Sequence, residues 1–185
     1  SKTQMDKYIR AQKEFVQPVI IATQEEALER EKQKSETKKT WTFKADNVRD
    51  FAFASSRKFI WDAMNVKIGN NYIMAMSMYP KEGNLLFFLY STKVIAHTLK
   101  WYSHYTVDYP YPVAWSIHTD RIGMEYPMIC FNGGRPNEDG TYSERTKYGM
   151  IGVILHEVGH NYFPMIINSD ERQWGWMDEG LNTFM

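Results

Sequence analysis

The feature that most constrains this chain is the pentapeptide His-Glu-Val-Gly-His at residues 156–160, which lies in an apolar stretch with helix signals at both ends. Thr141 followed three residues later by Glu144 is a capping-box pattern that predicts a helix start, and Ser143 is a rival N-cap. Pro164 predicts that the helix ends at the residue before it, because proline lacks a backbone N–H. We therefore expect one helix to carry the whole pentapeptide.

Two histidines in this helix stand at the spacing that a metal site needs. His156 and His160 are four residues apart, so their side chains lie one above the other and both imidazoles can reach one ion. Two imidazoles favour a borderline metal such as zinc. Glu157 points about 100° round the helix from His156. It can therefore stand beside a metal-activated water as a base without being a ligand.

A third ligand has to come from elsewhere in the chain, because a catalytic zinc usually takes three protein ligands. Acids occur downstream at Asp178 and Glu179, where a second helix is predicted to begin near Met177. Glu179 follows His160 after eighteen intervening residues. The residues alone leave three interpretations: Glu179 is the ligand, Asp178 is the ligand, or the two acids form a surface pair.

This spacing resembles that of the gluzincin aminopeptidases, the aminopeptidase-N-like zinc peptidases with a thermolysin-like catalytic domain. In that family the third ligand lies in an Asn-Glu-Gly sequence, whereas this chain has Asp-Glu-Gly at residues 178–180. The resemblance implies one Zn²⁺ per chain, held by His156, His160 and Glu179. It also implies that Glu157 takes a proton from the attacking water and passes it to the leaving amine.

A second motif resembles the same family. Residues 123–127 read Gly-Met-Glu-Tyr-Pro and are similar to the family's Gly-x-Met-Glu-Asn exopeptidase signature. The resemblance implies a strand whose backbone, at Gly123 and Met124, pairs with a bound peptide. It implies that the Glu125 carboxylate binds the free α-ammonium of the substrate. Tyr126 replaces the usual asparagine, a departure that concerns the fine structure of the motif.

The composition excludes several classes of function. The chain has 22 Lys+Arg and 22 Asp+Glu, so it lacks the basic surplus that general binding to nucleic acid or to anionic membranes requires. Cys130 is the single cysteine, which excludes an internal disulfide and any CxxC metal or redox motif. The longest strongly apolar run, residues 85–90, is too short to span a bilayer.

Alternating polar and apolar residues predict strands, and longer apolar stretches between Gly- and Pro-rich loops predict helices. We expect strands at residues 41–45, 57–64, 71–79, 113–119 and 126–131. We expect helices at residues 4–16, 85–107 and 144–163, and a charged, solvated helix or linker at 25–34 that opens on a capping box at Thr23. Mixed strands followed by helices indicate an α+β fold.

The resemblance makes this fold class specific. It implies an α+β thermolysin-like metallopeptidase catalytic domain, with a mixed sheet lobe and the HExxH helix, incomplete at its C-terminus. Residues 47–55 resemble the family's crossing into that domain, and residues 109–112 are also similar to it. We expect residues 1–48 to form a charged helical lead-in and the last strand of an upstream β domain. Residues 49–185 are expected to form the N-terminal part of the catalytic domain.

We also expect the chain to be a fragment of a longer protein. The resemblance implies a remaining C-terminal part of the parent protein, with a helical domain and a tyrosine that assists the reaction. Because the fragment lacks these parts, activity is expected of the parent protein and not necessarily of the fragment alone. The lack of disulfides fits a cytoplasmic protein and equally a bacterial periplasmic one.

Other chemically capable residues have plainer interpretations. His97 and His104 lie seven residues apart on the long predicted helix, without an acid or cysteine to complete a metal site. His118, on a predicted strand, is interpreted as structural. Cys130 has no base near it in the sequence, so we expect a buried thiol. Thr183 lies one turn after Glu179 and is a candidate for orienting the histidines, although a surface threonine is favoured.

Several functions are compatible with these residues. The first is a zinc aminopeptidase that removes N-terminal residues from peptides with a free N-terminus. A zinc endopeptidase would share the metal and Glu157 but would lack the amine anchor, so Glu125 discriminates between the two. An epoxide-opening hydrolase would use the same site. A non-catalytic scaffold member typically loses a ligand or the base, and this chain keeps all of them.

Overall fold

The computed structural model of the protein describes residues 1–32 and 34–185, and its core is a six-stranded mixed sheet with the order β1-β2-β3-β4-β6-β5. The strands are β1 (Val19–Ala22), β2 (Ile60–Ile68), β3 (Asn71–Tyr79), β4 (Val113–His118), β5 (Gly123–Tyr126) and β6 (Ile129–Asn132). The helices are α1 (Lys2–Ala11), α2 (Gln24–Glu31), α3 (Leu86–Tyr105), α4 (Glu144–Gly159) and α5 (Trp176–Phe184), with short helical turns at Lys81–Gly83 and Asn161–Ile166. The predicted α+β class is confirmed.

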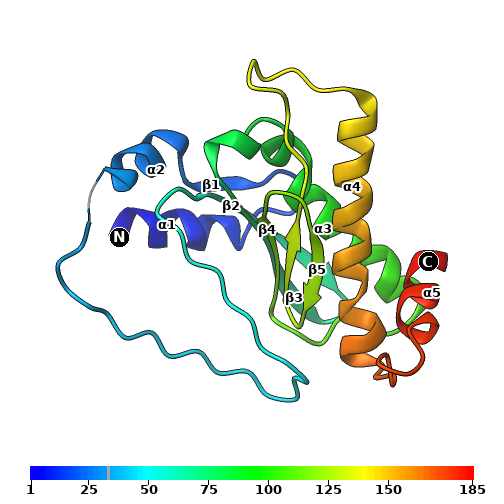
Figure 1. Cartoon of the computed structure of the whole chain (residues 1–185). Coiled ribbons are helices and arrows are strands. Elements are labelled where there is room, and N and C mark those ends of the chain that lie inside the picture. The colour runs from blue at the N-terminus through cyan, green and yellow to red at the C-terminus, as the bar shows by residue number, and fades with distance from the viewer. Residues whose placement is uncertain (33) are drawn as a thin grey trace.

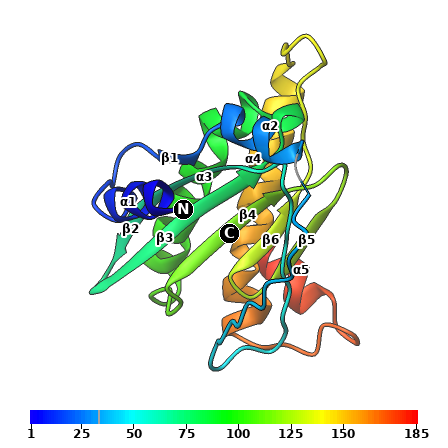
Figure 2. The same ribbon diagram turned by 90° about the vertical axis from the view of Figure 1, so that its left-hand side faces the viewer.

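The sheet separates two layers of helices, as Figures 1 and 2 show. The larger core lies between one face of the sheet and helices α3 and α4, and includes Ile73, Ala75 and Ile154. The opposite face carries α1 and a smaller cluster that includes Met74 and Met76. Successive residues of β3 therefore enter different cores, as the period of two in a strand requires.

The direction of pairing changes along the sheet and leaves β5 at an edge. Strands β1, β2 and β3 are antiparallel, β3 pairs in parallel with β4, and β4 pairs in parallel with β6. Strand β5 is antiparallel to β6 and is the last strand in the order. One side of its backbone is therefore free to pair with another extended chain. Figure 1 shows α4 running close to β5.

The first long hairpin differs from the prediction at its turn. Strand β3 has the predicted bounds, but β2 covers Ile60–Ile68 rather than residues 57–64. Asn65, expected to lie beyond the end of this strand, instead lies within it. Its backbone N–H donates to Glu14 O at 2.7 Å and its Nδ2 to Gln12 O at 2.6 Å. These acceptors lie far away in sequence, so the local pattern could not predict that the strand continues past residue 64.

Two further strand predictions are wrong. Residues 126–131 form a tight hairpin rather than one strand, because Met128 takes a left-handed φ of 66° between β5 and β6. Residues 41–45 form no strand at all. Trp41 and Phe43 are exposed there, since no strand in the described part of the chain pairs with this segment. Figure 1 shows that the segment before β2 swings away from the body of the molecule.

Helices α3 and α4 agree with prediction except at one end of α4, whereas α1 covers Lys2–Ala11 and stops short of the predicted end at residue 16. Helix α3 spans Leu86–Tyr105, within two residues of the predicted ends. Helix α4 begins after Ser143, whose side chain accepts from Thr146 N, so the rival N-cap is the one used. It ends at Gly159 rather than at residue 163, because a π-helical turn at Asn161–Ile166, with Pro164 inside it, takes over. The change in winding falls at the end of the HExxH segment.

The N-terminal region is more closely tied to the sheet than its sequence indicated. Thr23 caps α2 in a capping box with Glu26, as predicted. Strand β1 was not foreseen, yet it pairs with β2 and buries Ile21 in the smaller core. Residue 33, in the predicted charged stretch, lies outside the described residues. The division of the chain at residues 48 and 49 stays a prediction.

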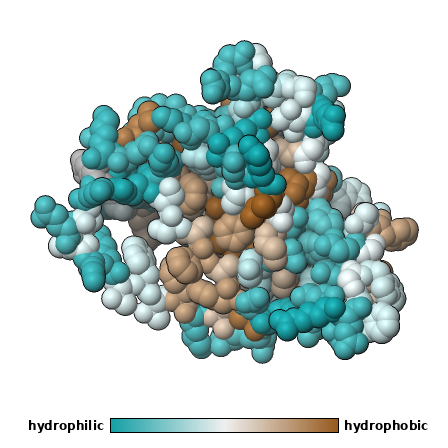
Figure 3. Space-filling view, viewed as in Figure 1, coloured by the Kyte–Doolittle hydropathy of each residue, from teal (hydrophilic) through white to brown (hydrophobic). Residues whose placement is uncertain are grey.

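The surface in Figure 3 is mostly hydrophilic, with apolar side chains gathered near the centre of this face. The segment between α2 and β2 contributes exposed aromatic side chains, among them Phe51 and Phe53. Within the described ranges, none of the helices combines the length and the apolarity that crossing a bilayer would take.

Candidate metal centre

Helix α4 presents the pentapeptide at its C-terminal end. His156 is half-buried, Glu157 is buried, and His160 is buried at the helix C-cap. The Nε2 atoms of the two histidines lie 3.1 Å apart, so their rings converge on one point as their spacing predicts. Their planes are inclined by 85°, which keeps the two nitrogens facing each other rather than stacking the rings.

Helix α5 brings Glu179 to the same point. Its Oε2 lies 2.9 Å from His156 Nε2 and 3.7 Å from His160 Nε2. The three ligand atoms lie within 4.8 Å of one another. The carboxylate of Glu179 is 59% exposed, so the cluster opens toward solvent on the side of α5. The fold thus brings Glu179 to the two histidines, although 18 residues separate it from His160 in sequence.

The donor set fits a zinc ion. Tetrahedral Zn²⁺ with bonds of about 2.0–2.1 Å places its donor atoms about 3.3 Å apart. The separations of 2.9, 3.1 and 3.7 Å bracket that value. Two imidazole nitrogens and one carboxylate oxygen also form a donor set that catalytic zinc uses. No rearrangement of the backbone is needed for the three side chains to share one ion.

The far side of His160 is held by the segment that follows α4. Nδ1 lies 2.8 Å from the carbonyl oxygen of Phe163, which can only accept, so Nδ1 carries the proton. Nε2 is then left with its lone pair directed at the cluster. Asp178 Oδ1 is also 2.7 Å from Nδ1. Asp178 therefore flanks His160 on the side away from Glu179, and the geometry favours Glu179 over Asp178 as third ligand.

Asn182 holds α5 against α4, although no sequence pattern singled it out. Its Nδ2 donates to His156 O at 2.7 Å, and its Oδ1 accepts from Tyr102 OH at 2.9 Å. Gly159 makes the contact possible, because a Cβ there would stand 2.2 Å from Asn182 Oδ1. Asn182 lies three residues after Glu179, one turn further on the same helix. The neighbouring Thr183 is exposed, as the favoured interpretation expected.

Glu157 lies in a buried environment, close to other carboxylates, that disfavours its charged form. Its side chain is buried, and Oε2 has no hydrogen-bond partner among the described residues. Burial, followed by repulsion from the nearby carboxylates of Glu125 and Glu179, raises the pKa of Glu157 to about 8. A bound cation would lower this pKa again.

Strand β5 lies directly beside Glu157. Glu125, on β5, has a carboxylate oxygen within 4.8 Å of ligand atoms of Glu157 and His160. Gly123 and Met124 are exposed on the same edge strand. Asn161, at the end of α4, fixes this hairpin: its Oδ1 accepts from Met128 N at 2.8 Å, and its Nδ2 donates to Val158 O. Nothing in the sequence singled out Asn161.

The remaining candidates stand apart from this cluster. His97 and His104 are exposed on α3 and pack against Trp101. His118 is buried, and burial lowers its pKa to about 4. Cys130 is a buried free thiol whose pKa burial raises to about 12. Its predicted burial is confirmed.

Comparisons with known proteins agree with the motifs. No protein-family model matches the chain. Over 131 residues, 63% of the chain, it is 24% identical to "Aminopeptidase 2" of Candida albicans, and the match spans 13% of that relative's length. A solved M1 zinc metallopeptidase from Deinococcus radiodurans matches with a TM-score of 0.50 and 16% identity, covering 68% of this chain and 27% of the other.

A second solved structure gives the same result. A mutant M1 zinc metallopeptidase from Deinococcus radiodurans, bound to a Tyr-Ser-Ala substrate, matches with a TM-score of 0.50 and 17% identity over the same shares of the two chains. The chain thus spans about a quarter of these structures. The resemblance that its motifs predicted is confirmed by these comparisons: this chain is similar in sequence to an aminopeptidase and has the fold of the M1 zinc metallopeptidases.

Proposed function

We propose that this chain is the N-terminal part of the catalytic domain of a zinc aminopeptidase, which removes N-terminal residues from peptides. The observation that carries the proposal is the convergence of His156, His160 and Glu179 within 4.8 Å of one another, beside the acid pair of Glu157 and Glu125. In this proposal His156, His160 and Glu179 hold one Zn²⁺, and residues 49–185 belong to the catalytic domain.

When bound, Zn²⁺ would polarise the scissile carbonyl and acidify the attacking water. Glu157 accepts the proton of that water at its carboxylate, whose Oε2 has no other partner among the described residues. It then delivers the proton to the nitrogen of the leaving amine. Phe163 O and Asp178 hold the Nδ1 side of His160, so that Nε2 keeps its orientation through the cycle.

Glu125 supplies the selectivity for a free N-terminus. Its carboxylate and that of Glu157 repel each other, which is one reason for the raised pKa of Glu157. A substrate ammonium placed beside Glu125 relieves this repulsion and forms an ion pair in a partly buried setting. The anchor lies next to the acid that handles the proton, so the bond that reacts is the one after the first residue.

The free edge of β5 supplies the backbone contacts. A peptide that extends along Gly123 and Met124 can pair with the edge strand, as in strand addition. Gly123 brings its backbone close to Glu157, since no side chain stands between them. The strand therefore holds the peptide against the acid without filling the cleft.

Metal analysis tests the first half of the proposal. The 185-residue chain, dialysed against buffer, is expected to retain close to one zinc per chain by elemental analysis, and His160→Ala is expected to retain almost none. Because the chain spans 13% of its curated relative's length, activity is measured on the full-length protein that contains it. Zinc absent from both the chain and the full-length protein would overturn the proposed metal site.

Peptides with free and acetylated N-termini test the second half. The proposal predicts that N-acetylation abolishes cleavage, because the acetylated nitrogen has no charge for Glu125 to bind. Glu125→Gln is expected to raise KM for free peptides about tenfold or more, in line with loss of a charge-assisted contact. Equal cleavage of free and acetylated peptides would indicate an endopeptidase instead.

A further inference from the structure

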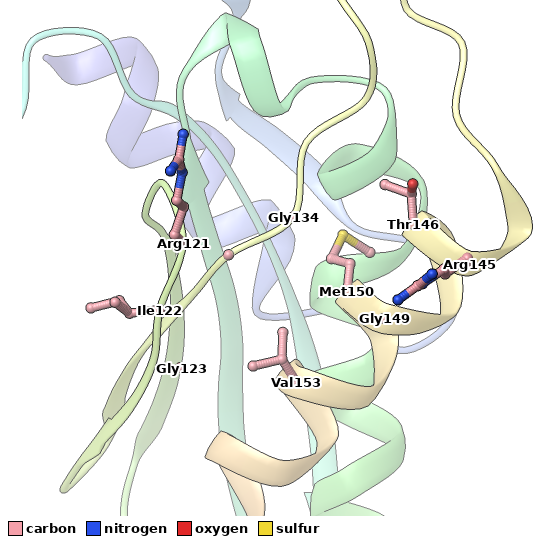
Figure 4. Close-up of a pocket in the computed structure, with 10 residues that line it drawn as sticks. Arg121, Ile122, Gly123, Gly134, Arg145, Thr146, Gly149, Met150 and Val153 are labelled. Atoms are coloured by element: carbon pink, nitrogen blue, oxygen red, sulfur yellow. The ribbon is translucent and has the colours of Figure 1, made fainter.

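A pocket of about 410 Å³ lies between the edge-strand hairpin and the N-terminal half of α4. Its walls include Arg121, Gly134, Arg145, Thr146 and Met150. Figure 4 shows Arg121 rising from the segment before β5 and Arg145 on the opposite wall, on α4. The roles proposed above use neither arginine.

The pocket continues the proposed cleft. Gly123 and Val153 belong to its walls, and both lie close to Glu157. A Cβ on Gly123 would stand 2.2 Å from Glu157 Oε1 and 2.9 Å from Val153 Cγ2. Val153 lies one helical turn before Glu157 on α4. The pocket therefore begins one turn away from the proposed base, on the side toward the start of the helix.

The order of residues along β5 gives the pocket a direction. Glu125, the proposed amine anchor, lies on one side of Gly123, and Ile122 and Arg121 lie on the other. A peptide with its ammonium at Glu125 and its first peptide bond beside Glu157 runs antiparallel to β5. Its later residues pass Gly123 and enter the pocket. The pocket thus receives the part of the substrate that follows the cleaved bond.

The charge of the pocket is positive. Its described lining holds Arg121 and Arg145 and no carboxylate. Arg121 has a distant ion pair, 3.6 Å from Asp120, and its side chain is 88% exposed. Arg145 is exposed and forms no salt bridge with any residue in the described ranges. A guanidinium without a protein partner is free to bind a planar anion such as a carboxylate.

We propose that Arg121 and Arg145 bind a substrate carboxylate on the leaving side of the cleft, so that the enzyme prefers short peptides with a free C-terminus. This inference rests on the proposed aminopeptidase function. It assigns the substrate class: peptides whose carboxylate stands a few residues after the cleaved bond. An acidic side chain at the same place offers the same chemistry.

The dimensions fix the length of the preferred peptide. Arg121 lies two residues before Gly123, in the segment that leads into β5, which is about 7 Å if that segment is extended. Arg145 lies twelve residues before Glu157 on α4, so the two backbone positions are about 18 Å apart along the helix axis. An extended peptide advances about 3.3 Å per residue. The carboxylate of a tri- to pentapeptide therefore falls within the pocket, whereas that of a dipeptide stops short of it.

Matched substrates isolate the carboxylate. The full-length zinc-loaded protein is assayed with tetra-alanine as the free acid, with its C-terminal amide, and with the amide carrying glutamate at the fourth position. Alanine p-nitroanilide, which has no residue after the cleaved bond, reports the basal activity. We expect kcat/KM about tenfold higher for the free acid than for the amide, mostly through KM, because both arginines are exposed and a hydrogen bond to a charged group is then weakened.

Matched variants isolate the arginines. The double variant Arg121→Gln/Arg145→Gln is expected to reduce the preference for the free acid to less than about twofold, with the p-nitroanilide rate unchanged. Lys147→Gln, which removes a cation of α4 that packs against Tyr90 outside the pocket, is expected to keep the preference. Recovery of rate by the glutamate-containing amide would extend recognition to side-chain carboxylates. No recovery would restrict it to the C-terminus.

The results separate the two proposals. Hydrolysis of alanine p-nitroanilide together with equal rates for free acid and amide would overturn the carboxylate pocket and leave the aminopeptidase standing. A preference that survives in the double variant would also overturn it. Failure to hydrolyse every substrate, p-nitroanilide included, would overturn the aminopeptidase and the inference that rests on it.

Discussion

Gly123 of the edge strand lies directly against the carboxylate of Glu157, with room for a hydrogen atom but not for a methyl group. A Cβ at this position would stand 2.2 Å from Glu157 Oε1 and 2.9 Å from Val153 Cγ2. Strand and helix come from segments that are 34 residues apart in sequence. The missing side chain therefore sets the width of the proposed cleft and the position of its base.

Gly123→Ala is expected to lower kcat about 100-fold, since a displacement near 1 Å of a catalytic group costs about that much. Zinc content should not change, because Gly123 does not contact the two histidines or Glu179. Gly152→Ala is the matched control: a Cβ there meets nothing within 4 Å, and the residue is exposed on the same helix. Wild-type kcat in Gly123→Ala would show that Glu157 does not depend on this contact.

Glu157→Gln is expected to keep zinc and to lose turnover by about 10³-fold, the usual contribution of a general base. The amide has the shape of the carboxylate but cannot take a proton from water. Glu179→Gln, which alters a proposed ligand instead, is expected to weaken zinc binding when measured by competition with a chelator. Substantial turnover by zinc-loaded Glu157→Gln would remove Glu157 from the role of base.

Asn182→Ala is expected to lower the free energy of unfolding by about 1–3 kcal/mol, because it removes the bonds to His156 O and Tyr102 OH inside a buried contact. Zinc affinity should also fall by at least about tenfold, since α5 carries Glu179. Thr183→Ala, at the exposed neighbouring position, should change stability by less than about 0.5 kcal/mol. Urea unfolding and chelator competition measure the two effects; similar values for the two variants would contradict the role of Asn182.

The stability of the chain is expected to depend on the pH through Asp62. This carboxyl is fully buried and accepts from Tyr79 OH at 2.6 Å and from Thr92 Oγ1. Burial raises its pKa from 3.8 to about 7. A raised folded-state pKa contributes stability that is present below about pH 4 and is lost as the pH rises through about 7.

Asp62→Asn removes this titration while keeping the shape of the side chain. Relative to the wild type, the variant should gain up to about 4 kcal/mol between pH 4 and pH 8, which is the full linkage of a three-unit pKa shift. Asp6→Asn, at an exposed position of α1, provides the control for a change of one charge. A stability difference between Asp62→Asn and wild type that is the same at both pH values would contradict the prediction.

Local patterns predicted what depends on local physics. The spacing of His156 and His160 predicted their convergence, because a helix fixes the positions of residues four apart. The capping box at Thr23 and the strand at residues 71–79 were equally local and are confirmed. The strand expected at residues 41–45 failed because alternation predicts a half-buried surface only where another element covers it.

Long-range contacts decided the rest. Asn65 was expected to lie just beyond a strand that ends at residue 64, but acceptors at Gln12 and Glu14 satisfy it inside the strand. Strand β1 has too few residues to show a period, and it exists because β2 offers it a free edge. The pocket lined by Arg121 and Arg145 has no sequence signal, since only the packing of β5 on α4 brings its two walls together.

Side-chain chemistry and helical spacing were enough to identify the residues that can bind a metal, the one that can act as a base, and the family they resemble. Tertiary packing was needed to show that Glu179 rather than Asp178 faces both histidines, that Asn182 contacts the helix of the histidines, and that a pocket with two arginines lies beside Glu157. Such relations join elements distant in the chain, and the packing of buried surfaces, rather than any local preference, fixes their distances.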